Sequence, residues 1–202
     1  MTRALFVIDV QNDFTEGGAL GVTGGAHVAQ AVTDHLRAHR DRYDLVVASR
    51  DWHAADGDNG GHFSLEPDFV DSWPVHCVQG STGADYHPDL DTALVDVHVL
   101  KGDGRPAYSL FDGLVDDGRP FGDALAATGV DEVDVVGLAT DHCVRASALD
   151  AVTAGLGVTV LTDLVAGVAP APSEAALAEL RAAGVRTVPS SDVVDGSTGV
   201  PA

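Results

Sequence analysis

One junction in the chain reads Val133-Asp134-Val135-Val136-Gly137-Leu138-Ala139-Thr140-Asp141-His142-Cys143-Val144-Arg145. Residues 133–139 form an apolar run typical of a buried strand, and helical spacing begins near Asp141. A cysteine in the first turn of a helix faces unpaired backbone N–H groups and the positive end of the helix dipole, which favour the thiolate. Cys143 is therefore a candidate nucleophile, although a lone cysteine is more often a small buried apolar residue.

The same alternation of short apolar runs with helical spacing extends along the chain. Strands are predicted at residues 4–10, 44–50, 96–101, 132–139, 157–162 and 185–188. Helices are predicted around residues 28–39, 121–128, 141–155 and 173–183, the last with Ser173 as its N-cap. Strands that alternate with helices form βαβ units and hence a parallel sheet. We predict a three-layer α/β/α fold with a parallel, roughly six-stranded, Rossmann-like sheet.

No linker-like stretch divides the 202 residues, so we predict a single domain over residues 1–191 and a flexible C-terminal tail over residues 192–202. The formal net charge is −20, with 31 acidic and 11 basic residues spread along the chain. This charge argues against nucleic acid and anionic membranes as partners and leaves a small-molecule substrate.

Two further features of the sequence bear on its location. The apolar run at residues 4–10 is too short to span a membrane, and its acidic neighbours Asp9 and Asp13 do not fit a signal peptide. The two cysteines, Cys77 and Cys143, are expected to be free thiols because the chain has no secretion features. We expect a cytoplasmic protein.

Chemically distinctive residues follow several of the predicted strands. Because ligands bind beyond the carboxyl ends of parallel strands, Asp9, Lys101 and Cys143 are expected at one edge of the sheet. A carboxylate, an ammonium and a thiol suffice for nucleophilic acyl transfer: Asp9 takes the thiol proton and Lys101 keeps Asp9 ionised. Backbone N–H groups at residues 139–143 suit a developing oxyanion. The alternative is a structural ion pair between Asp9 and Lys101.

The irregular segment at residues 51–88 contains a candidate metal site. Asp51 and His53, two positions apart, point to one side of an extended backbone, and His62 and His76 follow in the same segment. A mixed carboxylate and imidazole set suits one divalent metal ion, zinc, iron or manganese. The spacing matches no compact zinc signature, so surface histidines are the alternative.

Three aromatic residues, Phe14, Trp73 and Tyr108, lie in irregular segments near the same predicted edge. They could wall a pocket for a flat ring, whereas packing in the core is the more common role of an aromatic side chain.

The chain resembles the bacterial nicotinamidases (pyrazinamidases) of the isochorismatase-like cysteine hydrolases over nearly its full length. The stretches that carry the resemblance are Phe6-Val7-Ile8-Asp9-Val10-Gln11-Asn12-Asp13-Phe14, Asp51-Trp52-His53, His62-Phe63-Ser64, Trp73-Pro74-Val75-His76-Cys77, Lys101-Gly102, Ala107-Tyr108-Ser109 and Val135-Val136-Gly137-Leu138-Ala139-Thr140-Asp141-His142-Cys143-Val144.

The resemblance implies a role for each candidate. The strand-end Asp9, Lys101 and Cys143 would be catalytic, with the N–H groups of Ala139 and Cys143 as oxyanion donors beside a cis Leu138–Ala139 peptide. The metal ligands would be Asp51, His53, His62 and His76, and the residues around the substrate ring would be Phe14, Trp73, Tyr108 and His142. The implied reaction hydrolyses nicotinamide, and also pyrazinamide, through a thioester.

Two alternatives to this function remain open from the sequence. A member of the same superfamily could act on another amide, such as a carbamoyl compound, or on isochorismate. A non-catalytic metal-binding or thiol-sensing protein would be of another class. The presence of Asp9 and Lys101 argues against the second alternative, because neither residue is needed for metal binding.

Overall fold

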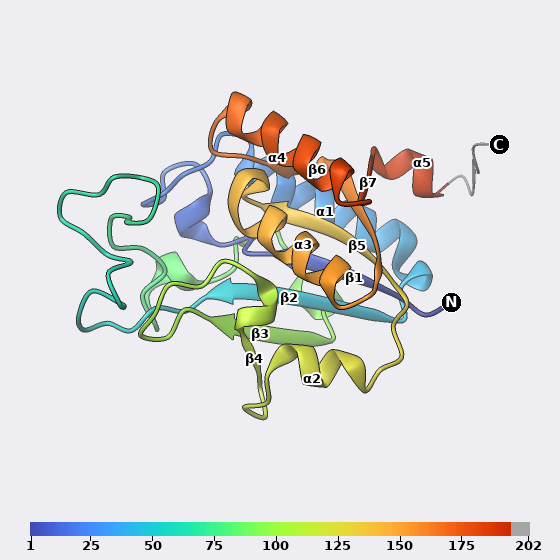
Figure 1. The fold of residues 1–202 in the computed structure, drawn as a ribbon, viewed down its shortest axis with the longest axis horizontal. Coiled ribbons are helices and arrows are strands. Elements are labelled where there is room, and N and C mark those ends of the chain that lie inside the picture. Colours follow the sequence, from blue (N-terminus) through green and yellow to red (C-terminus); the bar gives the residue numbers. More distant parts are fainter. Residues whose placement is uncertain (195–202) are drawn as a thin grey trace.

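A central sheet organises the molecule (Figure 1). The computed structural model describes residues 1–194, and within them the strands are β1 (Arg3–Ile8), β2 (Leu45–Asp51), β3 (Val97–Lys101), β4 (Leu114–Val115), β5 (Glu132–Leu138), β6 (Gly157–Ala166) and β7 (Arg186–Val188). Their order across the sheet is β4-β3-β2-β1-β5-β6-β7. All neighbouring pairs are parallel except β3 and β4. The predicted α/β class with a mainly parallel sheet is confirmed.

Helices cover both faces of this sheet (Figure 1). They are α1 (Gly25–His39), α2 (Phe121–Ala126), α3 (Arg145–Thr153), α4 (Pro170–Ala182) and α5 (Ser190–Val194). Phe6 and Ile8 of β1 pack in one core with residues of α2, α3 and α4, whereas Leu5 and Val7 pack in a second core with residues of α1 and α5. Burial on both faces explains why β1 is almost wholly apolar, since each buried side chain of this size contributes about 2 kcal/mol relative to exposure.

The strand order reverses beside β1. After β1 the chain builds β2 and β3 on one side, then returns to place β5 on the other side. Ile8 at the end of β1 is paired with Gly137 of β5. A Cβ atom on Gly137, whose φ is +111°, would lie 2.2 Å from the Ile8 oxygen, so only glycine permits this approach. The ends of β1 and β5 thus meet at the point where α/β sheets bind ligands.

Four local features differ from the expectations from sequence. The sheet gains the short antiparallel strand β4, which lies in a glycine-rich stretch without periodicity. A π-helical turn, Thr140–Val144, precedes α3. Ser173 is not the N-cap of α4: Ala169 holds that position, Pro170 begins the helix, and the Ser173 hydroxyl donates to the Ala169 carbonyl over 2.7 Å.

The fourth difference concerns the predicted tail. Residues 192–194 belong to α5, where Val193 is buried against the core on the α1 side of the sheet. The rest of the predicted tail, residues 195–202, lies outside the described residues.

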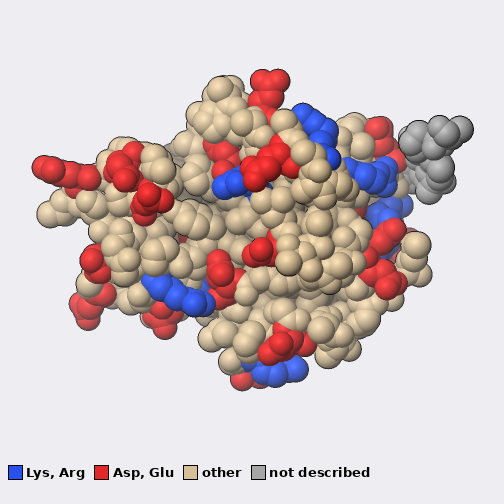
Figure 2. Space-filling model, in the orientation of Figure 1, with Lys and Arg blue, Asp and Glu red and all other residues tan. Residues whose placement is uncertain are grey.

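Acidic side chains are scattered over the face of the molecule seen in Figure 2, with fewer basic ones among them. This distribution agrees with a charge that is spread along the sequence. Among residues 1–194, no helix has the length and apolar character needed to cross a membrane.

A long irregular segment, residues 52–96, connects β2 to β3 and extends from one end of the sheet (Figure 1). It leaves β2 at Asp51 and enters β3 at Val97, which is paired with Val47 of β2, so its two ends lie at opposite ends of these parallel strands. Isolated bridges fix its course, including one between His53 and Val78 and one between Phe63 and Trp73. The bridge between His53 and Val78 thus brings the segment back to the carboxyl end of β2 before it runs on to the start of β3.

Candidate active site

The ends of three strands bring a carboxylate, an ammonium and a second carboxylate into one buried cluster. The Nζ atom of Lys101 lies 2.9 Å from Oδ2 of Asp9, and it also pairs with Oδ1 of Asp51. It donates to the Ala107 carbonyl over 3.3 Å and to the Sγ atom of Cys143 over 3.7 Å. The three residues predicted as catalytic are thus brought together, and all three are buried.

The charges of this cluster follow from burial and from pairing. Burial opposes the Lys101 charge, but the Asp51 and Asp9 carboxylates outweigh it and raise the pKa of Lys101 well above its usual value. Burial also raises the pKa of Asp9, against the opposing effect of Lys101. A buried carboxylate whose proton affinity is raised is suited to act as a base.

Cys143 lies in the π-helical turn that follows β5, and its side chain is nearly inaccessible. Burial raises the pKa of Cys143 well above its usual value, and the nearby Lys101 only partly opposes this. The resting group is therefore the thiol, and not the thiolate that a helix start alone would favour. A thiol at this position would need a base to become a nucleophile, and Asp9 is a carboxyl group adjacent to it. The Leu138–Ala139 peptide before this turn is cis, as the resemblance implied.

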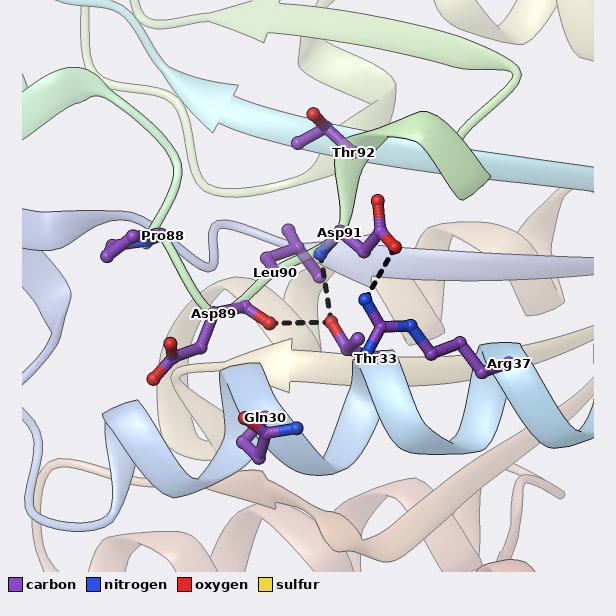
Figure 3. A pocket seen from close by; sticks show the side chains of 8 residues that line it. All are labelled: Gln30, Thr33, Arg37, Pro88, Asp89, Leu90, Asp91 and Thr92. Carbon is purple, nitrogen blue, oxygen red and sulfur yellow. Dashed lines mark hydrogen bonds and ion pairs between the residues drawn. The ribbon is translucent and has the colours of Figure 1, made fainter.

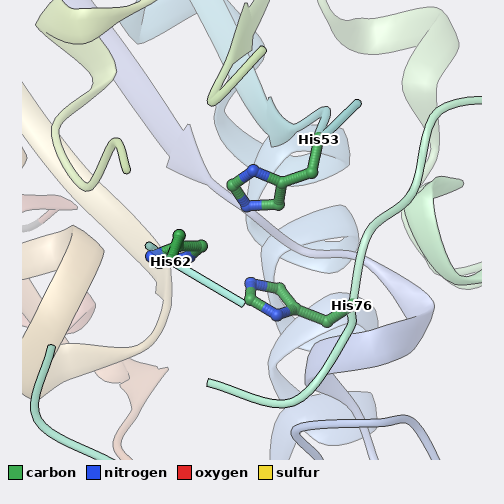
Figure 4. A group of neighbouring side chains, drawn as sticks. All are labelled: His53, His62 and His76. Atoms are coloured by element: carbon green, nitrogen blue, oxygen red, sulfur yellow. The ribbon is translucent and has the colours of Figure 1, made fainter. Parts of the chain in front are cut away.

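The imidazoles of His53, His62 and His76 converge at the start of the long segment (Figure 4). His53 donates from Nδ1 to the Gly102 carbonyl over 2.8 Å, and His76 donates from Nδ1 to the Pro74 carbonyl over the same distance. Each of these bonds leaves Nε2 as the free nitrogen and fixes the plane of the ring.

Asp51 completes the set of predicted metal ligands. Its Oδ2 atom lies 3.7 Å from His53 Nε2 and 3.8 Å from His76 Nε2. One ligand atom from each of the three histidines lies within 4.8 Å of the others. The cluster contains two buried nitrogens without a hydrogen-bond partner, His53 Nε2 and His62 Nδ1. Unpaired buried polar atoms are costly, and a bound cation would satisfy them.

Three of the four residues predicted around a substrate ring, Phe14, Trp73 and Tyr108, contact the histidines, and His142 packs against Trp73 and Tyr108. Trp73 donates from Nε1 to the Tyr108 hydroxyl over 2.9 Å, and its ring centroid lies 5.1 Å from that of His142. The ring of Tyr108 is 5.8 Å from that of His62, and the ring of Phe14 is 5.6 Å from that of His76. These four side chains, Phe14, Trp73, Tyr108 and His142, are called the aromatic wall, and they lie beside Cys143 and the three histidines.

Residues 3–192 match the family model of the isochorismatase domain. The chain belongs to the isochorismatase-domain family. This isochorismatase-domain protein is 53% identical over 189 residues to the nicotinamidase/pyrazinamidase of Mycobacterium tuberculosis, an alignment that covers 94% of the chain and 100% of the relative.

Two solved structures are similar in both fold and sequence. One is PnC1 from L. infantum in complex with nicotinate, with a TM-score of 0.80 and 35% identity, covering 94% of this chain and 93% of that one. The other is the pyrazinamidase of Pyrococcus horikoshii in complex with zinc, with a TM-score of 0.79 and 37% identity, covering 94% and 99%.

No role was assigned from the sequence to three residues that support the site of this isochorismatase-domain protein. The Ser49 hydroxyl donates to Oδ1 of Asp9 over 2.7 Å. The Gln11 side chain pairs with both the N–H and the carbonyl of Asp51, at 2.8 and 2.9 Å. Phe63 packs its ring 5.1 Å from that of His53. One signal was available: Ser49 precedes Asp51 by two positions on one strand, so both side chains point to the same face.

A separate hollow of about 420 Å³ lies between α1 and residues 88–92 (Figure 3). Its polar groups are already paired: Arg37 contacts Asp91 at 2.9 Å, and the Thr33 hydroxyl donates to the Asp89 carbonyl over 2.7 Å. This hollow is not lined by Cys143, by the three clustered histidines or by the aromatic wall. The chemistry of the isochorismatase-domain protein is therefore assigned to the strand ends.

Proposed function

We propose that this isochorismatase-domain protein is a nicotinamidase, an amidohydrolase that converts nicotinamide to nicotinate and ammonia and also accepts pyrazinamide. The observation that carries the chemistry is the position of Lys101 Nζ, 2.9 Å from the Asp9 carboxylate and 3.7 Å from the Cys143 sulfur. The 53% identity to a nicotinamidase/pyrazinamidase supports the substrate. The alternative, another amide or carbamoyl hydrolase, is not favoured, because the named relatives are nicotinamidases and pyrazinamidases.

The reaction follows from the arrangement of Asp9, Lys101 and Cys143. Asp9 removes the proton from Cys143, and the thiolate adds to the amide carbonyl of the substrate. The N–H groups of Ala139 and Cys143 hold the oxyanion. The tetrahedral species collapses to a thioester, and ammonia leaves with the proton that Asp9 returns. Lys101 keeps its proton throughout, and its positive charge offsets the negative charge that develops on the Cys143 sulfur.

The second half of the reaction uses the same base. Asp9 removes a proton from water, and the resulting hydroxide attacks the thioester carbonyl. Collapse of this second tetrahedral species releases nicotinic acid, which gives up its proton to solvent as nicotinate, and the Cys143 sulfur recovers its proton from Asp9. Phe14, Trp73, Tyr108 and His142 would hold the flat ring during both halves, since offset and edge contacts between aromatic rings are favourable.

Asp51, His53, His62 and His76 would hold one divalent metal ion, zinc, iron or manganese. The unpaired buried nitrogens of His53 and His62 fit this assignment, as does the mixture of imidazole and carboxylate donors. When bound, the ion would supply Lewis acidity beside the aromatic wall.

The organisation of the chain and its location complete the proposal. A single domain over residues 1–191 is supported by the family match to residues 3–192. A cytoplasmic location is supported by the two free thiols, Cys77 and Cys143, which suit a reducing compartment.

The direct test is ammonia release from nicotinamide by the purified protein loaded with zinc. The variant Cys143→Ala is expected to lose turnover while keeping its zinc, measured by metal analysis. Wild-type turnover in this variant would contradict the mechanism. Chelation is expected to abolish turnover, and readdition of zinc to restore it.

Mass spectrometry of the enzyme quenched during turnover of labelled nicotinamide is expected to show the acyl group on Cys143. This result would separate a hydrolase from a non-catalytic metal-binding or thiol-sensing protein.

A further inference from the structure

We propose that Ser49 is a positioning residue that assigns the two oxygens of the Asp9 carboxylate to separate tasks. This inference rests on the proposed function, in which Asp9 is the proton carrier. Ser49 lies on β2, beside the end of β1, and both Ser49 and Asp9 are fully buried. No solvent molecule can therefore substitute freely for a lost hydrogen bond between them.

Ser49 holds Asp9 through two hydrogen bonds to different parts of the same residue. The Ser49 hydroxyl donates to Oδ1 of Asp9 over 2.7 Å, and it accepts from the Asp9 N–H over 3.3 Å. The backbone of Asp9 has φ of +46°, a conformation that residues with a side chain rarely adopt. A partner that grips both the backbone and the carboxylate fixes this conformation and the side-chain rotamer together.

Occupation of Oδ1 leaves Oδ2 for the chemistry. Oδ2 lies 2.9 Å from Lys101 Nζ and has no partner besides this ion pair. Lys101 Nζ in turn contacts Cys143 Sγ at 3.7 Å, so Oδ2 and the sulfur share one ammonium partner. A carboxylate free to rotate would present its oxygens to Cys143 in a range of orientations, and proton transfer needs a single one.

The hydroxyl also influences the charge of Asp9. Lys101, Asp51 and Cys143 are the ionisable groups around this carboxyl group. Burial raises its pKa, whereas the hydrogen bond from Ser49 opposes that rise, after the larger effect of Lys101. Removal of the hydroxyl should therefore shift the acid limb of activity to higher pH as well as slow the reaction.

The test compares two substitutions at Ser49 with a matched control. Ser49→Ala removes the hydroxyl, and Ser49→Thr keeps it. The control is Thr33→Val, because the Thr33 hydroxyl is also buried, donates over 2.7 Å to a carbonyl and accepts over 2.9 Å from an N–H, but lies at the hollow beside α1. The zinc-loaded enzymes are assayed for nicotinamide hydrolysis as a function of pH.

We expect Ser49→Ala to lower kcat roughly 100-fold, with KM changed less than about threefold and an unchanged zinc content. Its acid limb should move to higher pH. Ser49→Thr should recover most of the rate, and Thr33→Val should leave kcat and the pH profile unchanged. The proposal is overturned if Ser49→Ala retains a kcat within about threefold of wild type. It is also overturned if Thr33→Val loses as much activity as Ser49→Ala.

Crystal structures of the variants make this test independent of the substrate. In Ser49→Ala the Asp9 carboxylate is expected to rotate away from its wild-type orientation, and in Ser49→Thr to keep it. If the wild-type protein does not hydrolyse nicotinamide, the proposed function fails, and these structures still decide the role of Ser49. An unmoved Asp9 in Ser49→Ala would overturn the positioning role.

Discussion

His53 and Gly102 are joined by a hydrogen bond of 2.8 Å from the imidazole Nδ1 to the glycine carbonyl. Gly102 directly follows Lys101, so one short stretch of chain carries the ammonium of the proposed catalytic cluster, Asp9, Lys101 and Cys143, and orients a histidine of the proposed metal site. A Cβ atom on Gly102 would lie 2.5 Å from Cε1 of that imidazole. The ring and the backbone are therefore packed without room for a side chain.

The substitution Gly102→Ala should displace the His53 ring and weaken zinc binding by about 10- to 100-fold, the usual effect of losing an outer partner of a ligand. A competition titration with a chromophoric chelator measures this affinity. Gly118→Ala is the matched control, because Gly118 also has positive φ, +83°, but no atom lies within 4 Å of its Cβ position. Equal zinc affinity in the two variants would contradict this prediction.

The contact between Gly137 and Ile8 predicts an effect on stability. In Gly137→Ala the new methyl group would lie 2.2 Å from the Ile8 oxygen, and β1 and β5 must separate. We expect a loss of about 3 kcal/mol or more in the free energy of unfolding, measured by urea denaturation, together with loss of turnover. Gly129→Ala, at φ of +70° without a close neighbour, should cost about 1 kcal/mol. Similar losses in both variants would refute the packing argument.

A buried chain of polar groups away from the catalytic cluster predicts a pH-dependent stability. His35 donates from Nε2 to the Tyr43 hydroxyl over 2.8 Å, and this hydroxyl donates to Asp134 over 3.0 Å. Burial lowers the pKa of His35 from 6.5 to about 4, assisted by the positive charges of His39 and Arg42. Between these two values the unfolded chain binds a proton that the folded chain does not.

Stability should therefore fall as the pH decreases from 6.5 towards 4, by up to about 3 kcal/mol. Urea denaturation at a series of pH values, in wild type and in His35→Gln, isolates this contribution as the difference between the two curves. The difference should change across this pH window. Parallel curves for the two proteins would show that His35 contributes nothing.

The hydrogen bond between Trp73 and Tyr108 predicts coupled effects on substrate binding. Trp73→Phe and Tyr108→Phe each remove one partner of the 2.9 Å bond, and each should raise KM for nicotinamide by a few-fold. The increase in KM of the double variant should be smaller than the product of the two single increases, since the bond is lost only once. Strictly multiplicative effects would mean that the bond does not organise the aromatic wall.

The core of the fold was predictable because its physical cause is local. Strands β1 and β5 are buried on both faces and therefore appear in the sequence as short apolar runs. Strand β4 was missed because two residues, Leu114 and Val115, pair with β3 inside a glycine-rich stretch and carry no periodic pattern. The N-cap of α4 was misplaced because Pro170 can begin a helix without a side-chain cap.

The candidate site was predictable in part for a similar reason. A carboxylate or an ammonium at the end of an apolar strand is conspicuous, and the carboxyl ends of parallel strands meet at one edge. The contribution of Ser49 depends instead on the register between β1 and β2, which the sequence of one strand does not specify. Likewise, the thiol state of Cys143 depends on burial by distant segments, which outweighs the local effect of a helix start.

The long segment between β2 and β3 has a consequence for how such a protein can change. Within it, the ends of the stretch at residues 54–77 are held side by side by the bridge between His53 and Val78, and this stretch carries two of the four proposed metal ligands, His62 and His76, and Trp73. The entropy of loop closure depends only weakly on length, so such an insertion can be lengthened or exchanged at little cost to stability. Evolution or a designer can thus change this stretch separately, while the ends of the sheet strands keep the residues of the thiol chemistry.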